Sequence, residues 1–144
     1  MHYRIESAMP SKVAMQKSLQ PFNKVYFSIN DYNSYYYKMR NFGKSLVIRA
    51  NDTLPISFLF YYDNLPHIFI SMIWTHPKYQ GNGYAKILMR HLINRTNKNI
   101  FLRVQKNNPA VFLYLSFGFK TIKTERGEHL MLYKQENHKH LKSP

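Results

Sequence analysis

The hydrophobic period of this chain changes between residues 67 and 97, and that change limits the fold more than any other feature. Residues 67–75 (HIFISMIWT) are rich in β-branched and aromatic side chains, which predicts a strand. Beyond them the apolar residues recur at i, i+3, i+4 and i+7, the spacing of one helix face: Ala85, Leu88, Met89 and Leu92. We expect a helix from about Gly83 to Asn97, and so a domain that mixes strands with helices.

The rest of the chain continues this mixture. Further strands are expected at residues 2–6, 45–50, 56–62, 99–104, 120–124 and 129–133. Further helices are expected between Ser11 and Pro21, at residues 30–39 (or an ordered loop there) and at residues 110–117. The last helix follows a typical start, NNP at residues 107–109, and ends at Gly118. The order βααβββαβαββ predicts an α/β (α+β) fold, a mixed β-sheet flanked by helices.

Length and composition narrow the class of protein. The chain has 144 residues, which suits a single domain at residues 1–134 with a basic polar tail at residues 135–144. Hydrophobic residues make up 44%, which excludes general disorder. Cysteine is absent, which excludes disulfides, thiolate metal sites and thiol nucleophiles. Neither a membrane-length apolar run nor the apolar stretch of a signal peptide is present, so we expect a cytoplasmic protein.

The charge is strongly positive and unevenly placed. The chain has 21 Lys and Arg against 7 Asp and Glu, a formal net charge of +14. No acidic residue lies between Asp63 and Glu125, while basic residues recur throughout that stretch. Such a stretch attracts anions, and the candidates are nucleic acid, an acidic membrane surface or a phosphorylated cofactor. For any single lysine, a solvated position with no partner is the alternative.

A glycine-rich corner lies between the strand at residues 67–75 and the following helix. Its sequence is QGNGYA at residues 80–85, preceded by His76-Pro77. Glycines let the main chain approach a ligand closely, and the first N–H groups of a helix have no internal partner. With the helix dipole, these features suit a phosphate group. The spacing is neither that of a P-loop nor that of a dinucleotide fingerprint, and a plain strand-to-helix turn is the alternative.

Two motifs together resemble the GNAT superfamily of acetyltransferases. Residues 80–85 fit its pyrophosphate-binding pattern Gln/Arg-x-x-Gly-x-Gly/Ala. Residues 107–119 (NNPAVFLYLSFGF) fit its pattern Asn-x-x-Ala-x-x-Leu-Tyr-x-x-x-Gly-Phe. The resemblance covers residues 45–133 well and the first forty residues only through element order. It implies a twisted mixed sheet whose two central parallel strands splay apart, and acetyl-CoA as the co-substrate, with no metal.

The resemblance also implies cofactor-binding residues. Backbone amides of the corner would bind the pyrophosphate: Gln80, Gly81, Asn82, Gly83, Tyr84 and Ala85. Main-chain groups of Ile73, Trp74 and Thr75 would pair with the pantetheine arm like an added strand. The side chain of Asn107, or of Asn108 if the register is one residue off, would contact the pantetheine. The lysines that could neutralise the 3′-phosphate are Lys78, Lys86 and Lys106.

By the same resemblance, the reaction would be direct attack of an amine on the thioester in a ternary complex. Tyr114 matches the family tyrosine near the sulfur and would be the general acid, protonated at neutral pH. The N–H of Thr75 or Trp74 would stabilise the oxyanion. Residues 67–75 contain no carboxylate to serve as base. The base would be His76, or a water chain that ends on a backbone carbonyl or on a hydroxyl such as that of Ser71.

The sequence gives fewer indications of which residues bind the acceptor amine. Tyrosines that could line the acceptor mouth, at least half of which should instead pack on the sheet, are Tyr32, Tyr35, Tyr36, Tyr37, Tyr61 and Tyr62. With few carboxylates available, an aminoacyl-tRNA or a protein amine is a better acceptor than a polyamine. A GNAT fold that binds acyl-CoA or nucleic acid without catalysis is the alternative, and a purely RNA-binding protein is a third. We expect a monomer or a homodimer.

Overall fold

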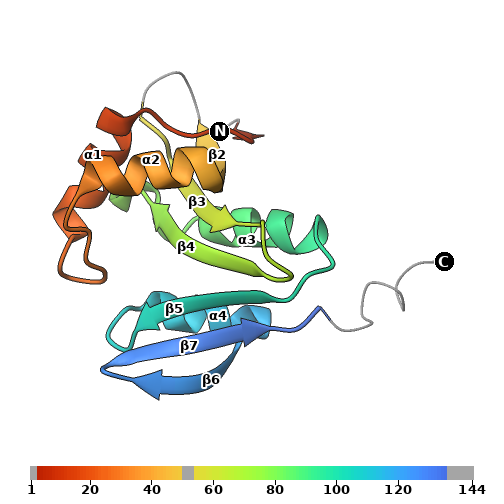
Figure 1. The fold of residues 1–144 in the computed structure, drawn as a ribbon. Coiled ribbons are helices and arrows are strands. Elements are labelled where there is room, and N and C mark those ends of the chain that lie inside the picture. The colour runs from red at the N-terminus through yellow and green to blue at the C-terminus, as the bar shows by residue number, and fades with distance from the viewer. Residues whose placement is uncertain (1–2, 50–53, 136–144) are drawn as a thin grey trace.

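The computed structural model describes residues 3–49 and 54–135, and its elements follow the order expected from the sequence (Figure 1). The strands are β1 (Arg4–Glu6), β2 (Lys44–Arg49), β3 (Ser57–Tyr62), β4 (Ile68–Thr75), β5 (Ile100–Gln105), β6 (Lys120–Glu125) and β7 (Glu128–Tyr133). The helices are α1 (Lys12–Leu19), α2 (Tyr32–Phe42), α3 (Tyr84–Asn94) and α4 (Ala110–Phe117), with short 3-10 turns η1 (Gln20–Phe22) and η2 (Pro77–Tyr79). Residues 136–144 of the expected tail lie outside the described residues.

Local capping explains where the helices begin and end. Ser11 Oγ accepts the Ala14 N–H at 3.1 Å, as expected for the cap of α1. The segment expected as a helix or a loop is the helix α2, because Asp31 accepts the Ser34 N–H at 3.1 Å. The expectation that α3 reaches Asn97 is wrong. The helix ends at Asn94, because the Arg95 N–H bonds to the Leu92 carbonyl in a tighter turn.

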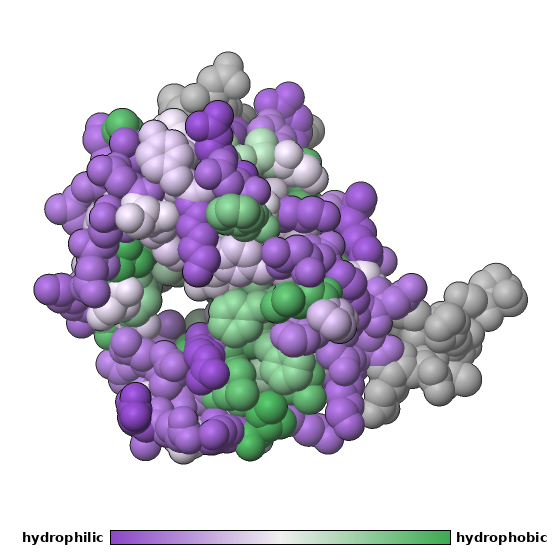
Figure 2. All heavy atoms as spheres, in the orientation of Figure 1, coloured by the Kyte–Doolittle hydropathy of each residue, from purple (hydrophilic) through white to green (hydrophobic). Residues whose placement is uncertain are grey.

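The sheet is mixed, and its two halves separate in the middle. The strand order is β1-β2-β3-β4-β5-β7-β6, with every neighbouring pair antiparallel except β4 and β5. Those two parallel strands pair only from Ile68↔Ile100 to Ile70↔Leu102, although β4 continues to Thr75 and β5 to Gln105. Beyond that point the strands diverge (Figure 1), and the space-filling view shows an opening between their C-terminal ends (Figure 2). The predicted splay of the central strands is present.

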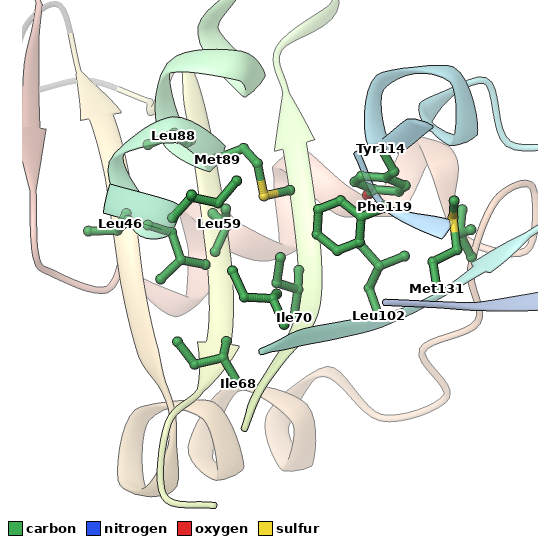
Figure 3. Packing of buried hydrophobic residues seen from close by; sticks show 14 of the residues in the cluster. Leu46, Leu59, Ile68, Ile70, Leu88, Met89, Leu102, Tyr114, Phe119 and Met131 are labelled. Carbon is green, nitrogen blue, oxygen red and sulfur yellow. The ribbon is translucent and has the colours of Figure 1, made fainter. Parts of the chain in front are cut away.

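Two hydrophobic clusters bury the two faces of the sheet. Figure 1 shows α1 and α2 on one face and α3 and α4 on the other. On the α3 and α4 face, Leu88 and Met89 of α3 pack against Leu59 and Ile70 of the sheet (Figure 3). On the α1 and α2 face, Met15, Leu19 and Met39 pack with Phe58, Phe60 and Trp74. Both clusters contain residues of β3 and β4, so these two strands are covered on both faces.

A β-bulge in β4 reverses the direction of its backbone groups. Phe60 of β3 is opposite Met72 and Tyr61 is opposite Ile70, so Ser71 is an extra residue in β4. Below the bulge, the Ile68 N–H bonds to Asn99 on the β5 side; above it, the His76 N–H bonds to Ile56 on the β3 side. Even-numbered amides therefore face β5 before Ser71 and β3 after it.

Candidate active site

The corner between β4 and α3 is tied to the end of β4 by its own side chains. Gln80 Nε2 donates to the Thr75 carbonyl at 3.3 Å. Asn82 Nδ2 donates to the Tyr79 carbonyl at 3.0 Å. Tyr79 in turn packs edge-on against the buried Tyr84 ring, with ring centroids 6.2 Å apart. These contacts hold the corner in a defined shape.

Glycines leave the outer surface of this corner open. Gly81 (φ +83°) and Gly83 (φ +82°) both lie in the left-handed region, where other residues are strained. A Cβ built on either glycine would meet no atom within 4 Å. Helix α3 has no side-chain cap, and its first internal bond is from the Ile87 N–H to the Gly83 carbonyl. The amides of Gly83 to Lys86 thus donate no hydrogen bond among the described residues and are available to an anion.

The bulge decides which amides of β4 face the opening. Because the His76 N–H bonds to β3, alternation turns the main-chain groups of Trp74 toward β3 as well. The N–H groups of Ile73 and Thr75 turn toward the opening, where β5 no longer pairs with β4. On the β3 side, Ser57, which the sequence did not single out, is buried and donates from Oγ to the Trp74 carbonyl at 2.7 Å. Its Oγ also lies 2.9 Å from Thr75 Oγ1.

Tyr114 lies on the buried face of α4. Only 5% of it is exposed, and its ring packs against Phe119 at a centroid distance of 5.8 Å. Figure 3 shows both residues above β5, between Met89 of α3 and Met131 of β7. No described residue forms a hydrogen bond with its hydroxyl. Burial raises the pKa of Tyr114 well above its ordinary value, so the phenol stays protonated at neutral pH.

The two asparagines before α4 have different partners. Asn108 Oδ1 accepts the Ala110 N–H at 2.9 Å and so binds the first amide of α4, with Pro109 at the N-cap position. Asn107 is exposed, and its Nδ2 reaches the Val25 carbonyl only at 3.5 Å, the limit of a hydrogen bond. Asn107 Oδ1 accepts no hydrogen bond among the described residues, while Asn108 Oδ1 already accepts one.

His76 has a local structural contact. Its Nδ1 accepts the Lys78 N–H at 3.0 Å, which caps the turn η2. Its ring packs edge-on between those of Trp74 and Tyr79, at centroid distances of 5.9 and 5.7 Å. Because Nδ1 accepts this bond, the hydrogen of the neutral ring is on Nε2. To accept a proton at Nε2, the ring would have to carry its hydrogen on Nδ1 and lose the bond from Lys78. Its position therefore suits a cap of the turn better than a base.

Comparisons with known proteins identify the family of the chain. Residues 13–119 match the family model described as the acetyltransferase (GNAT) family. The chain belongs to the GNAT acetyltransferase family. Members of this family transfer an acyl group from a CoA thioester.

Individual relatives differ in how much of this acetyltransferase they match. Human cysteine-rich protein 2-binding protein is 41% identical over 54 residues, which is 37% of this chain but only 7% of that protein. The ribosomal-protein-S18-alanine N-acetyltransferase of Escherichia coli superposes with a TM-score of 0.74 at 20% identity, over 91% of this chain and 92% of that one. The PaiA N-acetyltransferase of Thermoplasma acidophilum, solved with coenzyme A, gives 0.66 at 16% identity, over 93% and 99%.

The tyrosines expected near the acceptor mouth of this acetyltransferase are mostly packed. Tyr32, Tyr35, Tyr36 and Tyr62 pack on the α1 and α2 face of the sheet and Tyr61 on the other face. Tyr37 is 46% exposed. The expectation that at least half pack against the sheet is confirmed.

A polar pocket of about 400 Å³ lies beside the opening on the acetyltransferase's α1 and α2 side. It is lined by Arg103, Gln105, Asn107, Glu125, Arg126, Gly127 and Glu128. Arg103 and Gln105 alternate with the buried Leu102 and Val104, so they point away from α4. Only Asn107 of this set was expected, because the other residues meet through the β6–β7 turn rather than through a motif. The pocket carries both signs of charge.

No helix in residues 3–49 and 54–135 is long and apolar enough to cross a membrane. Over the same residues, no group of three or more His, Asp or Glu side chains could hold a metal ion.

Proposed function

We propose that this acetyltransferase transfers the acetyl group of acetyl-CoA to a primary amine by direct attack in a ternary complex. The observation that carries the proposal is the opening between β4 and β5, bordered by the free amides at the start of α3 on one side and by Tyr114 on the other. One surface receives a phosphorylated cofactor and the opposite surface an amine, so that the two meet between the strands.

The residues fit the cofactor in three places. The uncapped amides from Gly83 to Lys86, with the open space over Gly81, suit the pyrophosphate. The outward amides of Ile73 and Thr75 suit the pantetheine arm, which adds to β4 like a strand. Of the expected set, Trp74 is the weakest main-chain partner, because its groups turn toward β3. Asn107 remains the side chain proposed for the pantetheine.

The proposed reaction consists of attack on the thioester, departure of the thiolate and two proton transfers. The amine nitrogen attacks the thioester carbon, a C–N bond forms, and the oxyanion accepts a hydrogen bond from the Ile73 or Thr75 N–H. The C–S bond then breaks, and the departing thiolate takes the phenolic proton of Tyr114. The amine loses a proton to water at the opening, since no carboxylate is present in β4, and this proton then restores the Tyr114 phenol. Positioning of the two reactants supplies much of the acceleration.

The acceptor we propose is an amine carried on a macromolecule, an aminoacyl-tRNA or a protein, rather than a polyamine. A chain with a net charge of +14 repels a polycation. The pocket beside the opening pairs arginines with glutamates and so suits a chain with amides and both charges. The E. coli neighbour is named for acetylating an alanine of ribosomal protein S18, which supports a protein amine.

Isotope-labelled acetyl-CoA tests the proposal directly. The full chain is incubated with it and a cell extract, and label is then measured by mass spectrometry in the tRNA, protein and metabolite pools. Label in tRNA or protein, with stoichiometric thiol release, is the expected result. Label in polyamines would overturn the acceptor class. Binding of acetyl-CoA without thiol release in any pool would instead support the non-catalytic binding module.

A further inference from the structure

A side-chain hydrogen bond joins α2 to the bulge of β4. The Tyr35 hydroxyl lies 2.8 Å from Ser71 Oγ, across 36 residues of sequence. The Tyr35 ring packs against Phe60, with centroids 6.3 Å apart, and Phe60 is the residue opposite the bulge on β3. One residue of α2 thus contacts both strands at the point where β4 gains its extra residue.

The apolar pattern of β4 requires an extra residue but does not fix its position. In a regular strand, Ile70 and Trp74 would lie on the same face, because side chains alternate between the two faces. Ile70 instead packs on the α3 face and Trp74 on the α2 face, so one residue between them must be unpaired. Met72 and Ile73 are only half buried, so their packing specifies the position of the bulge weakly. A bulge moved from residue 71 to residue 73 would keep both Ile70 and Trp74 in place.

Such a move would alter the backbone at the opening. With the bulge at Ser71, the Met72 N–H faces β3 and the Ile73 N–H faces the opening. With the bulge at residue 73, the even-numbered amides would face β5 as far as Met72. The Met72 N–H would then no longer bond to β3. The Ile73 N–H would then belong to the unpaired residue and lose its fixed direction.

We propose that the hydrogen bond between Tyr35 and Ser71 is a register lock, which holds the bulge at Ser71 and so keeps the Ile73 N–H directed at the thioester. Tyr35 is in this sense a positioning residue, acting through Ser71 and the backbone. The catalytic part of the inference rests on the proposed function, because only a bound acetyl-CoA gives the Ile73 N–H a partner. The register itself is a property of the protein alone.

The surroundings of Tyr35 suit a permanent lock. Burial raises the pKa of Tyr35 above its ordinary value, so its hydroxyl stays protonated at physiological pH and remains able to donate. The ring is held by its packing on the sheet, which leaves the hydroxyl little freedom to turn elsewhere.

Two variants and one matched control test the lock. Tyr35→Phe and Ser71→Ala each remove one hydroxyl of the pair. Tyr36→Phe removes a neighbouring hydroxyl on the same helix, which donates to the Pro10 carbonyl at 3.0 Å and does not touch the bulge. The first measurement is amide hydrogen exchange by NMR on the free protein. The second is the carbonyl stretch of ¹³C-labelled acetyl-CoA bound to each variant, which reports hydrogen bonding to the thioester oxygen.

We expect exchange at the Met72 amide to rise about tenfold in Tyr35→Phe and Ser71→Ala, the effect of one lost hydrogen bond, while Trp74 and His76 keep their protection. The double variant should rise no further, because both changes break the same bond. The acetyl carbonyl stretch should move toward its frequency in water in these variants but not in Tyr36→Phe.

Other results would overturn the lock. An equal rise at Met72, Trp74 and His76 would mean general destabilisation, and an unchanged Met72 amide would mean that packing alone holds the bulge. An altered Met72 amide with an unaltered carbonyl stretch would reject the link to the thioester. A wild-type chain that does not bind acetyl-CoA would overturn the proposed function, while the exchange experiment would still decide the register.

Discussion

Tyr114 and the corner glycines show how much of the site depends on single residues. The Tyr114 hydroxyl has no partner in the described chain, although its ring is buried in a well-packed cluster. The hydroxyl is therefore free to donate to a bound substrate, which is what transfer of a proton to the CoA sulfur would require.

Replacement of Tyr114 by phenylalanine should separate catalysis from binding. We expect kcat to fall about 100-fold, the usual effect of a general acid, with little change in acetyl-CoA affinity and no loss of thermal stability. Because the pKa of Tyr114 is raised, the wild-type rate should also not decline between about pH 7 and pH 9. Steady-state kinetics with calorimetric binding measure both. Tyr133→Phe is the control, because the Tyr133 ring also packs against Phe119, at a centroid distance of 5.5 Å. Equal losses in kcat and affinity would reject the acid role.

Gly83→Ala should weaken cofactor binding by more than it weakens the fold. The left-handed backbone costs alanine about 1 kcal/mol, and the added Cβ meets no protein atom. Gly127→Ala is a matched control, because Gly127 has φ +77° and equally open space at the β6–β7 turn. Urea unfolding should show similar losses for both variants, while acetyl-CoA titration should show a loss only for Gly83→Ala. Unchanged CoA affinity in Gly83→Ala would place the pyrophosphate elsewhere.

At the scale of elements, β4 and β5 are held together near their N-terminal ends and diverge toward their C-terminal ends. The turn from β3 to β4 is clamped by Lys98, whose Nζ donates to Asp63 Oδ1 at 2.8 Å, to the Asp63 carbonyl at 3.0 Å and to the Leu65 carbonyl at 2.9 Å. This clamp joins the start of β4 to the start of β5, where the two strands still pair.

Because of this clamp, we expect the free energy of unfolding to fall at acid pH. Burial acts to raise the pKa of Asp63, but hydrogen bonds from Lys98 and Lys44 outweigh it and hold the pKa below its ordinary value. A depressed pKa in the folded state stabilises the protein above the unfolded pKa of about 4, and this stability is lost as the pH falls through the folded pKa. Asp63→Asn should therefore lower the free energy of unfolding by about 1 kcal/mol at pH 7, an effect that vanishes near pH 2.

Chemical denaturation across pH checks this prediction. Glu125→Gln is the comparison, because the Lys123–Glu125 pair at 2.8 Å has both side chains more than half exposed and should contribute little. A pH-independent difference between wild type and Asp63→Asn would mean that the loss comes from packing of the turn rather than from the charge.

At the scale of the whole molecule, the net charge of +14 should strengthen the binding of the negatively charged acetyl-CoA. Lys78 and Lys86 are exposed beside the corner, and Lys106 is exposed after β5. Raising the ionic strength from about 0.05 to 0.5 M shortens the screening length to a few ångströms and should weaken acetyl-CoA binding about tenfold. The neutral thioester S-acetyl-N-acetylcysteamine, which lacks phosphates, should react at a rate independent of salt. Equal salt dependence of both would place the effect on the acceptor.

Local patterns in the sequence determined the order of elements, the caps at Ser11 and Gly118, the corner at residues 80–85 and the position of Tyr114, because each depends on neighbours along the chain. The tertiary structure decided which of Thr75 and Trp74 turns toward the opening, since a bulge at Ser71 reverses the alternation and no local pattern predicts where an unpaired residue lies. It also decided the separate uses of Asn107 and Asn108 and the pocket around Arg103 and Glu128. These depend on contacts between elements distant in sequence, which periodicity and motif spacing do not encode.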